Sequence, residues 1–254
     1  MILNKTLYGD GMPEIHLTPR LFGDHFLNTL DIDEQVMVQK VRHLVREVIG
    51  PKAAEVGQND VFAWENFRLL AKERVLATAF PKEYGGTDAR QVLRIRIIEE
   101  LARVCSASAS LMTGADLSTR AVAAGASESF KEQLLPGLCE GALQCAFALT
   151  EPAAGSDVRG LQTTIDRDGD HYIVNGQKKF ITRASTADWF VVIGRTRDTP
   201  SSFNAVLIPR DAPGLQICPE AGKLGWYGVP ISSLVFDKVR VPAANRMGQE
   251  GDGF

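Results

Sequence analysis

The chain has 254 residues, of which 44% are hydrophobic and 23% are charged, and its formal net charge is -3 at pH 7. This composition is typical of a globular protein with one large or two ordinary domains, and it lacks the basic excess that nucleic acids and anionic membrane surfaces attract. No apolar stretch approaches the length of a membrane span, and the N-terminus lacks a basic segment that leads into an apolar core. We therefore expect no nucleic-acid partner, no membrane partner and a cytoplasmic location.

The first half of the chain has the periodicity of helices. Residues 1–30 carry no sustained period and are predicted to form an N-terminal extension. Asp31 begins an amphipathic pattern with an acidic start, and Gly50-Pro51 predicts its end. Further helical patterns are expected at residues 62–75, 89–104, 107–125 and 127–138. Together they predict a helical domain over residues 31–145.

The second half has the periodicity of strands. Residues 143–149 form a mostly apolar, strand-like segment, and apolar residues then recur with a period near two. Strands are expected near residues 163–167, 171–174, 178–182, 189–195, 204–208 and 233–240. Asp168-Gly169 and Asn175-Gly176 predict hairpin turns, because these residue types accept a positive φ angle. Residues 146–254 are therefore predicted to form a small antiparallel β-domain.

The order of the elements sets the fold class. Helices come first and strands second, without the β-α-β alternation of a doubly wound sheet, so the predicted class is α+β. The chain has neither a GxGxxG run nor a Walker-type GxxxxGK run, so any dinucleotide must bind by another geometry. The cysteines are too scattered for a CxxC site, and the histidines lack metal-ligand spacing. We expect reduced thiols and no metal site.

A loop rich in small residues follows the strand-like segment and is the main candidate for chemistry. Gly155 and Gly160 permit backbone geometries that a Cβ would forbid, while Thr150 and Ser156 offer hydroxyl groups. Such a loop can hold a heterocycle edge or a phosphate. It can equally be a tight turn at the end of a strand, in which Ser156 or Asp157 bonds its own backbone. The chemistry of the loop does not decide between these interpretations.

The run Ala148-Leu149-Thr150-Glu151-Pro152-Ala153-Ala154-Gly155-Ser156-Asp157-Val158-Arg159-Gly160 resembles the acyl-CoA dehydrogenase signature, and every element of that pattern is present. The resemblance extends over residues 31–254. It continues in Phe80-Pro81-Lys82-Glu83-Tyr84-Gly85-Gly86, Asn175-Gly176-Gln177-Lys178-Lys179-Phe180-Ile181-Thr182, Val239-Arg240-Val241-Pro242-Ala243 and Gly248-Gln249-Glu250-Gly251-Asp252-Gly253-Phe254. It implies an N-terminal all-α domain followed by an antiparallel β-barrel-like domain.

The resemblance also implies a flavin cofactor, FAD, and the residues that hold it. Phe147, Leu149 and Thr150 would form one wall of the site, and Ser156 would reach towards the pyrophosphate. Phe180 and Thr182 would form the second wall, with the Thr182 hydroxyl bonded to the N5 side of the flavin. Donors at these positions would stabilise the negative charge that a reduced flavin carries. For Phe147 and Phe180, a role in packing alone is the alternative.

The implied reaction is α,β-dehydrogenation of an acyl thioester, with coenzyme A or a carrier protein as the carrier of the acyl group. An electron-transferring flavoprotein would reoxidise the flavin, and the pathway would belong to fatty acid and lipid metabolism. The family's catalytic glutamate is expected beyond Phe254, in a C-terminal helical domain, so we predict no catalytic residue in this chain. Glu99 and Glu100 are expected to face solvent or cap helices, and Glu151 belongs to the signature without being the base.

On this interpretation the chain is an incomplete or split dehydrogenase that needs the helical domain and works as a homo- or hetero-oligomer. The sequence departs from the family in two places. Tyr227-Gly228-Val229-Pro230-Ile231 replaces a strand that usually reads Arg-x-Ser-x-Thr, and Arg183 stands where Asn is common. Arg183 would contact a phosphate or, more simply, lie in solvent.

Two further interpretations stay open. The first is a dehydrogenase for thioesters of an acyl carrier protein, or a related flavin oxidase or monooxygenase. The second is a non-catalytic partner subunit, in which the altered strand and the missing base leave binding alone.

Overall fold

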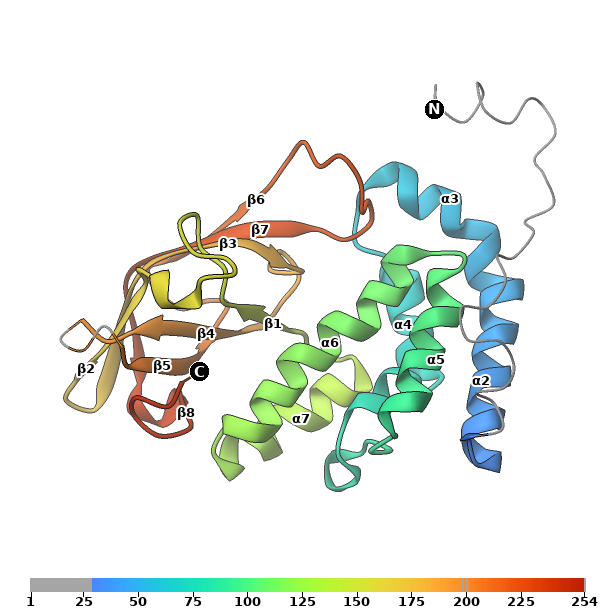
Figure 1. Cartoon of the computed structure of the whole chain (residues 1–254), viewed down its shortest axis with the longest axis horizontal. Helices are drawn as coiled ribbons and strands as arrows, with labels where there is room; N and C mark the ends of the chain where they lie inside the picture. The colour runs from blue at the N-terminus through green and yellow to red at the C-terminus, as the bar shows by residue number, and fades with distance from the viewer. Residues whose placement is uncertain (1–28, 198, 200, 254) are drawn as a thin grey trace.

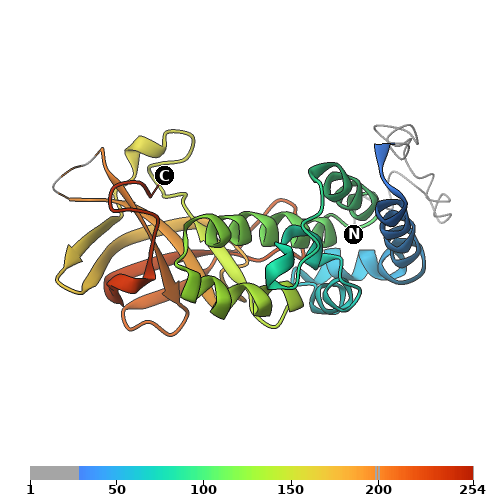
Figure 2. The same cartoon turned by 90° about the horizontal axis from the view of Figure 1, so that it is seen from below.

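The structure is a computed structural model, and it describes residues 29–197, 199 and 201–253, with the side chain of Asn59 left out. Helices gather at one end of the molecule and strands at the other, with α6 reaching from one to the other (Figures 1 and 2). Most of the predicted N-terminal extension lies outside the described residues. No helix in the described part is long and apolar enough to cross a membrane.

The helical unit starts at α2, Ile32–Leu44, which Asp31 and Glu34 cap reciprocally through a capping box. After residue 60 come the helices α4 (Trp64–Lys72), α5 (Gln91–Ala102), α6 (Ser106–Gly125) and α7 (Glu128–Glu140). Each of these four overlaps a helix that the sequence predicts, because each has a sustained apolar period.

The predicted stop at Gly50-Pro51 is wrong. After α2 the chain continues through a π-helical turn, Val45–Ile49, into α3, Gly50–Asn59. Pro51 lies in the first turn of α3, where its missing N–H group is not needed. A Cβ on Gly50 would lie 2.7 Å from the carbonyl oxygen of Val45, so only glycine fits this wide turn. The proline therefore starts a new helical segment without ending the old one.

The strands form one twisted sheet with the order β6-β7-β3-β2-β4-β5-β8, and β1 pairs with β4. Their bounds are Cys145–Ala148 (β1), Thr164–Asp168 (β2), His171–Thr182 (β3), Trp189–Arg195 (β4), Phe203–Pro209 (β5), Leu215–Pro219 (β6), Ile231–Pro242 (β7) and Arg246–Met247 (β8). The predicted order of helices before strands is confirmed. The sheet is mixed, however, because β1 runs parallel to β4 and a single residue pair joins β2 and β4 in the same sense.

Asn175-Gly176 does not form the predicted hairpin turn, since β3 runs straight through it with a register shift against β7. Gly176 has a φ of 133°, and a Cβ there would lie 2.7 Å from Thr163. The Asn175 side chain accepts a hydrogen bond from the backbone N–H of Lys238 at 2.9 Å. The pair thus builds a β-bulge, which uses the same positive φ as a hairpin turn.

Three apolar clusters hold the molecule together. One lies among the helices, one lies inside the curled sheet, and the third joins α6 and α7 to the outer face of β1, β4 and β5. The third cluster includes Val122 and Leu138 from the helices and Val191 and Leu207 from the strands. Because this shared core is continuous, the position of α6 against β1 is fixed by packing.

Candidate functional site

The two predicted walls of the site meet where the chain leaves β1 and passes beside β3. The backbone N–H of Lys179 donates to the carbonyl oxygen of Thr150 at 2.8 Å. The ammonium of Lys178 donates to the carbonyl oxygen of Leu149 at 2.9 Å. These two bonds bring Leu149 and Thr150 next to the segment that carries Phe180, although the segments are far apart in the sequence.

Glu151 and Lys178 form a buried ion pair directly behind this contact, and we call the pair the latch. The Lys178 ammonium lies 2.7 Å from the Glu151 carboxylate, and the two side chains are 0% and 2% exposed. The same carboxylate accepts the backbone N–H groups of Gln162 at 2.6 Å and Thr163 at 3.1 Å. Glu151 therefore closes the small-residue loop on itself and ties it to β3.

The surroundings of the latch decide its charge. Burial acts to raise the pKa of Glu151, but the hydrogen bonds from Lys178, Thr163 and Gln162 outweigh burial and hold the pKa below its usual value. Burial lowers the pKa of Lys178 to about 8, against the opposing effect of Glu151. A carboxylate that accepts three hydrogen bonds and is held ionised is a poor proton acceptor, so Glu151 is poorly suited to act as a base.

Phe180 has an unusual backbone and an unusual exposure for a strand aromatic. Its φ is 59° and its side chain is 56% exposed, at a second register shift between β3 and β7. The ammonium of Lys179 lies 5.1 Å from the ring centroid. A left-handed conformation in a bulky residue costs free energy, and such residues concentrate at functional sites. Among the described residues, Phe180 is thus exposed and belongs to none of the three apolar clusters.

The remaining predicted residues lie around this point. Along β1, Ala146 and Ala148 face the interior of the sheet, whereas Phe147 and Leu149 pack against the cluster shared with the helices and stay partly exposed. Thr150 and Thr182 are also partly exposed, and Ser156 is exposed on the loop. The arrangement offers an aromatic ring, apolar side chains and hydroxyl groups on β1, on β3 and on the loop that follows β1. This combination fits a flat heterocycle with a phosphate-bearing tail.

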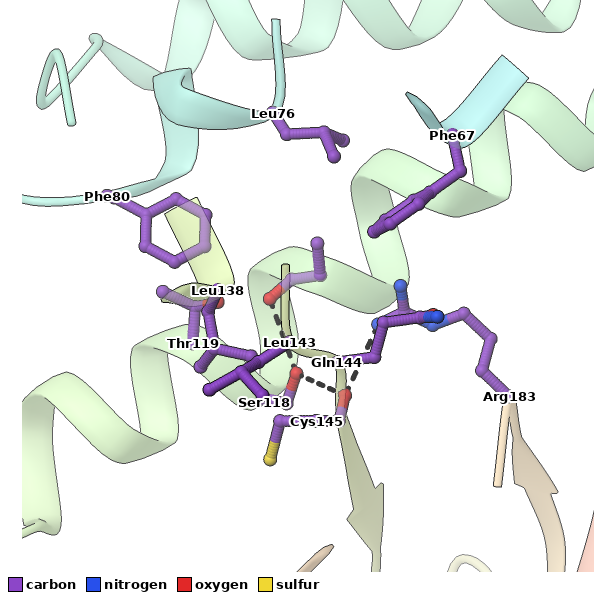
Figure 3. A pocket seen from close by; sticks show the side chains of 11 residues that line it. Phe67, Leu76, Phe80, Ser118, Thr119, Leu138, Leu143, Gln144, Cys145 and Arg183 are labelled. Carbon is purple, nitrogen blue, oxygen red and sulfur yellow. Dashed lines mark hydrogen bonds between the residues drawn. The ribbon is translucent and has the colours of Figure 1, made fainter. Parts of the chain in front are cut away.

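Arg183 is not solvated, contrary to the simpler expectation. It follows β3 directly, has a φ of 62° and is only 3% exposed. Its side chain runs beneath the start of β1, where Nη2 donates to the carbonyl oxygen of Cys145 at 3.3 Å (Figure 3). Sequence reasoning missed this burial because it depends on α6, which lies far from Arg183 in the chain.

The segment predicted as an altered strand is a loop. β7 begins only at Ile231, and the residues before it reach the helical unit, where Val229 is buried in the helical core. Asp60, which follows α3, accepts hydrogen bonds from the Lys223 ammonium at 2.6 Å and from the backbone N–H of Gly228 at 3.1 Å. The departure from the family pattern thus lies at a contact between the two halves of the molecule.

Glu99 and Glu100 lie away from the site, on α5. Glu100 is buried, not solvent-facing as expected, and its carboxylate lies 2.8 Å from Arg42 Nε and 3.5 Å from Arg96 Nη2. Glu99 pairs with Arg96 one turn earlier. Both carboxylates belong to an ion-pair network within the helical unit, so their role is structural.

Comparison with known proteins gives consistent matches. The model of the acyl-CoA dehydrogenase N-terminal domain matches residues 32–142, and that of the middle domain matches residues 146–239. The chain is 34% identical over 231 residues to a cyclohex-1-ene-1-carbonyl-CoA dehydrogenase of Syntrophus aciditrophicus. This alignment covers 90% of this chain and 56% of the relative.

Solved structures match in the same way. Butyryl-CoA dehydrogenase of Megasphaera elsdenii superposes with a TM-score of 0.82 at 28% identity, over 89% of this chain and 61% of that one. A glutaryl-CoA dehydrogenase of Mycobacterium smegmatis in complex with FADH2 superposes with a TM-score of 0.77 at 27% identity, over 89% of this chain and 58% of that one. The chain thus spans less than two thirds of the length of each of these relatives.

Proposed function

Because the chain belongs to the acyl-CoA dehydrogenase family, we propose that it binds FAD where β1 meets β3 and takes part in the α,β-dehydrogenation of an acyl-coenzyme A thioester. The observation that carries this proposal is Phe180, a solvent-exposed aromatic held on left-handed backbone beside the end of β1. The complex of a similar chain with FADH2 supports the choice of cofactor.

Each predicted residue has a role in this proposal. Phe147, Leu149 and Thr150 form the wall that β1 supplies, and Phe180 and Thr182 form the wall that β3 supplies. Ser156 offers its exposed hydroxyl to the pyrophosphate. When bound, FAD accepts the hydride that leaves the β-carbon of the thioester.

The latch gives both walls a fixed spacing. It ties the carbonyl of Leu149, the ends of the small-residue loop and β3 to one buried pair of charges. Donors that are already oriented lose little free energy on binding a ligand, so this support favours a preformed site.

The proton that leaves the α-carbon needs an acceptor, and we propose that a glutamate outside the described residues supplies it, from a C-terminal helical domain. The carboxylate next to the site, Glu151, accepts three hydrogen bonds, one of them from the Lys178 ammonium, and is therefore poorly suited to this step. We further propose reoxidation by an electron-transferring flavoprotein and assembly into an oligomer, as the resemblance implies.

Titration with FAD, followed by the quenching of flavin fluorescence, tests the proposal. The chain alone is expected to bind weakly, and addition of a relative's C-terminal helical domain is expected to tighten binding. Thr182→Val and Ser156→Ala should each weaken binding, because each removes one hydroxyl, whereas Ser201→Ala on a remote turn should not. Equal affinity in all variants would contradict the assigned residues.

A panel of thioesters separates the open alternatives. Flavin bleaching by coenzyme A thioesters without oxygen uptake supports the dehydrogenase. A preference for carrier-protein thioesters, or rapid oxygen uptake, favours the related oxidase or monooxygenase. Flavin that no thioester reduces, in the presence of the helical domain, favours a non-catalytic subunit.

A further inference from the structure

A β-bulge near the end of β3 brings two neighbouring side chains to the same side of the strand. Lys179 and Phe180 lie opposite a single residue of β7, Ser233, at the second register shift between these strands. In a regular strand, neighbouring side chains point to opposite faces, but a bulge re-aims one of them. Here the Lys179 ammonium lies 5.1 Å from the centroid of the Phe180 ring, so both side chains share one side.

Lys179 also joins the two proposed walls of the flavin site. Its backbone N–H donates to the carbonyl oxygen of Thr150 at 2.8 Å, on the wall that β1 supplies. Its ammonium lies over the ring of Phe180, on the wall that β3 supplies. The side chain of Lys179 is half-buried. Lys179 therefore contacts one member of each wall, and its charge lies next to the exposed aromatic ring.

The charge of Lys179 is not neutralised by the residues around it. The preceding cation, Lys178, is paired with Glu151, so the latch as a whole carries no net charge. Arg183, four residues further along the chain, runs beneath the start of β1. Lys179 itself forms no ion pair in the described part of the chain, and its ammonium contacts the Phe180 ring instead. Unpaired lysines are common on protein surfaces, but the bulge and the bond to Thr150 hold this one at the proposed site.

The proposed cofactor supplies the missing negative charge at its ring in one redox state alone. The oxidised ring of FAD is uncharged, and uptake of two electrons and one proton converts it into an anion. A cation beside the ring stabilises the anion more than the uncharged ring. We propose that the Lys179 ammonium stabilises the reduced flavin and thereby raises the reduction potential of bound FAD, an inference that rests on the proposed function.

The neighbours of Lys179 favour the ring over the pyrophosphate of FAD as the group that its charge meets. Thr150 and Phe180, which both contact Lys179, are assigned to the walls that hold the ring. Ser156, which is assigned to the pyrophosphate, lies on the loop after β1. The ammonium loses little when it turns towards the ring, because an exposed cation–π contact is weak and the lysine stem is flexible.

The test measures the reduction potential of FAD bound to the chain in the presence of a relative's C-terminal helical domain. Dithionite supplies the electrons, and a dye of known potential reports the equilibrium. Lys179→Met keeps the length of the side chain and removes its charge, whereas Lys179→Arg keeps the charge. Lys238→Met is the matched control, because Lys238 is an exposed lysine of β7 at the first register shift between β3 and β7.

Lys179→Met is expected to lower the affinity for reduced FAD about tenfold relative to the affinity for oxidised FAD, as the loss of one charge-assisted contact implies. For a two-electron couple, this change lowers the reduction potential by about 30 mV. Lys179→Arg and Lys238→Met should keep the wild-type potential. The difference between the wild type and Lys179→Met should shrink at high ionic strength, since salt screens a half-exposed charge but leaves packing unchanged.

An unchanged potential in Lys179→Met would overturn the inference, and so would an equal fall in Lys238→Met. Equal weakening of oxidised and reduced FAD would also overturn it, because the ammonium would then meet the pyrophosphate, whose charge is the same in both states. The FAD titration is read separately on the same samples. FAD binding with an unchanged potential removes only the role of Lys179, whereas failure of the wild type to bind FAD removes the proposed function itself and this role with it.

Discussion

Replacing Lys178 by Met should destabilise the protein far more than the loss of an ordinary salt bridge. The substitution keeps the size of the side chain, but the Glu151 carboxylate, which is only 2% exposed, loses its cation. The carbonyl oxygen of Leu149 loses a hydrogen-bond donor as well. Breaking a buried pair from one side costs about 3–5 kcal/mol of unfolding free energy. The two backbone N–H groups that still reach Glu151 place the expected loss at the lower end of this range, about 3 kcal/mol.

The measurement is urea unfolding followed by circular dichroism, with the double variant Lys178→Met, Glu151→Leu alongside. Removing both charges should recover most of the loss, because no unpaired charge stays buried. Arg240→Met serves as the control, and loss of its exposed pair with Asp168 should cost about 1 kcal/mol or less. A loss below about 1 kcal/mol in Lys178→Met, or a double variant as unstable as the single one, would refute the role of the latch.

Three further predictions follow from the same contacts. Phe180→Gly should relieve the left-handed strain at φ 59°, so the unfolding free energy should be unchanged or up to about 1 kcal/mol higher, while the affinity for FAD falls. A loss of stability in parallel with the loss of FAD affinity would contradict a functional role for the strain. Because the pKa of Glu151 is held below its usual value of 4.5, the carboxylate should stabilise the fold above pH 4.5 and lose this effect as the pH falls further. Glu151→Gln should therefore flatten the acid side of the curve of unfolding free energy against pH. An unchanged acid side would show that Glu151 is not the source of the pH dependence. Asp60→Ala removes two hydrogen bonds between the loop before β7 and α3, so urea unfolding should show a loss of about 1–3 kcal/mol; a loss within error would mean that the buried Val229 holds the loop alone.

The sequence predicts those parts of the fold that local periodicity determines. The helices after residue 60 and the strand at residues 189–195 agree with the structure, since each has a regular apolar period. Gly50-Pro51 and Asn175-Gly176 are misread because their local chemistry suits two geometries. Proline fits the first turn of a helix as well as the end of one, and Asn-Gly fits a bulge as well as a hairpin.

The candidate site is predicted by residue type but not by its supports. The signature includes Glu151, yet its partner Lys178 can be identified only when β1 and β3 lie side by side. The prediction that Arg183 lies in solvent is wrong for the same reason, because its burial requires the glycine of α6 that faces it, Gly114. Tertiary contacts of this kind carry no local signal in a single sequence.

The FAD titration tests the central claim most directly, and Phe180→Ala is the decisive variant because its ring is exposed and supports no core packing. The proposed site predicts that the wild type, with the helical domain present, binds FAD in a one-to-one ratio. It also predicts that Phe180→Ala binds at least about tenfold more weakly at unchanged melting temperature, as loss of an aromatic stacking contact implies. A wild type without affinity for FAD under these conditions, or a Phe180→Ala variant with full affinity, would contradict it.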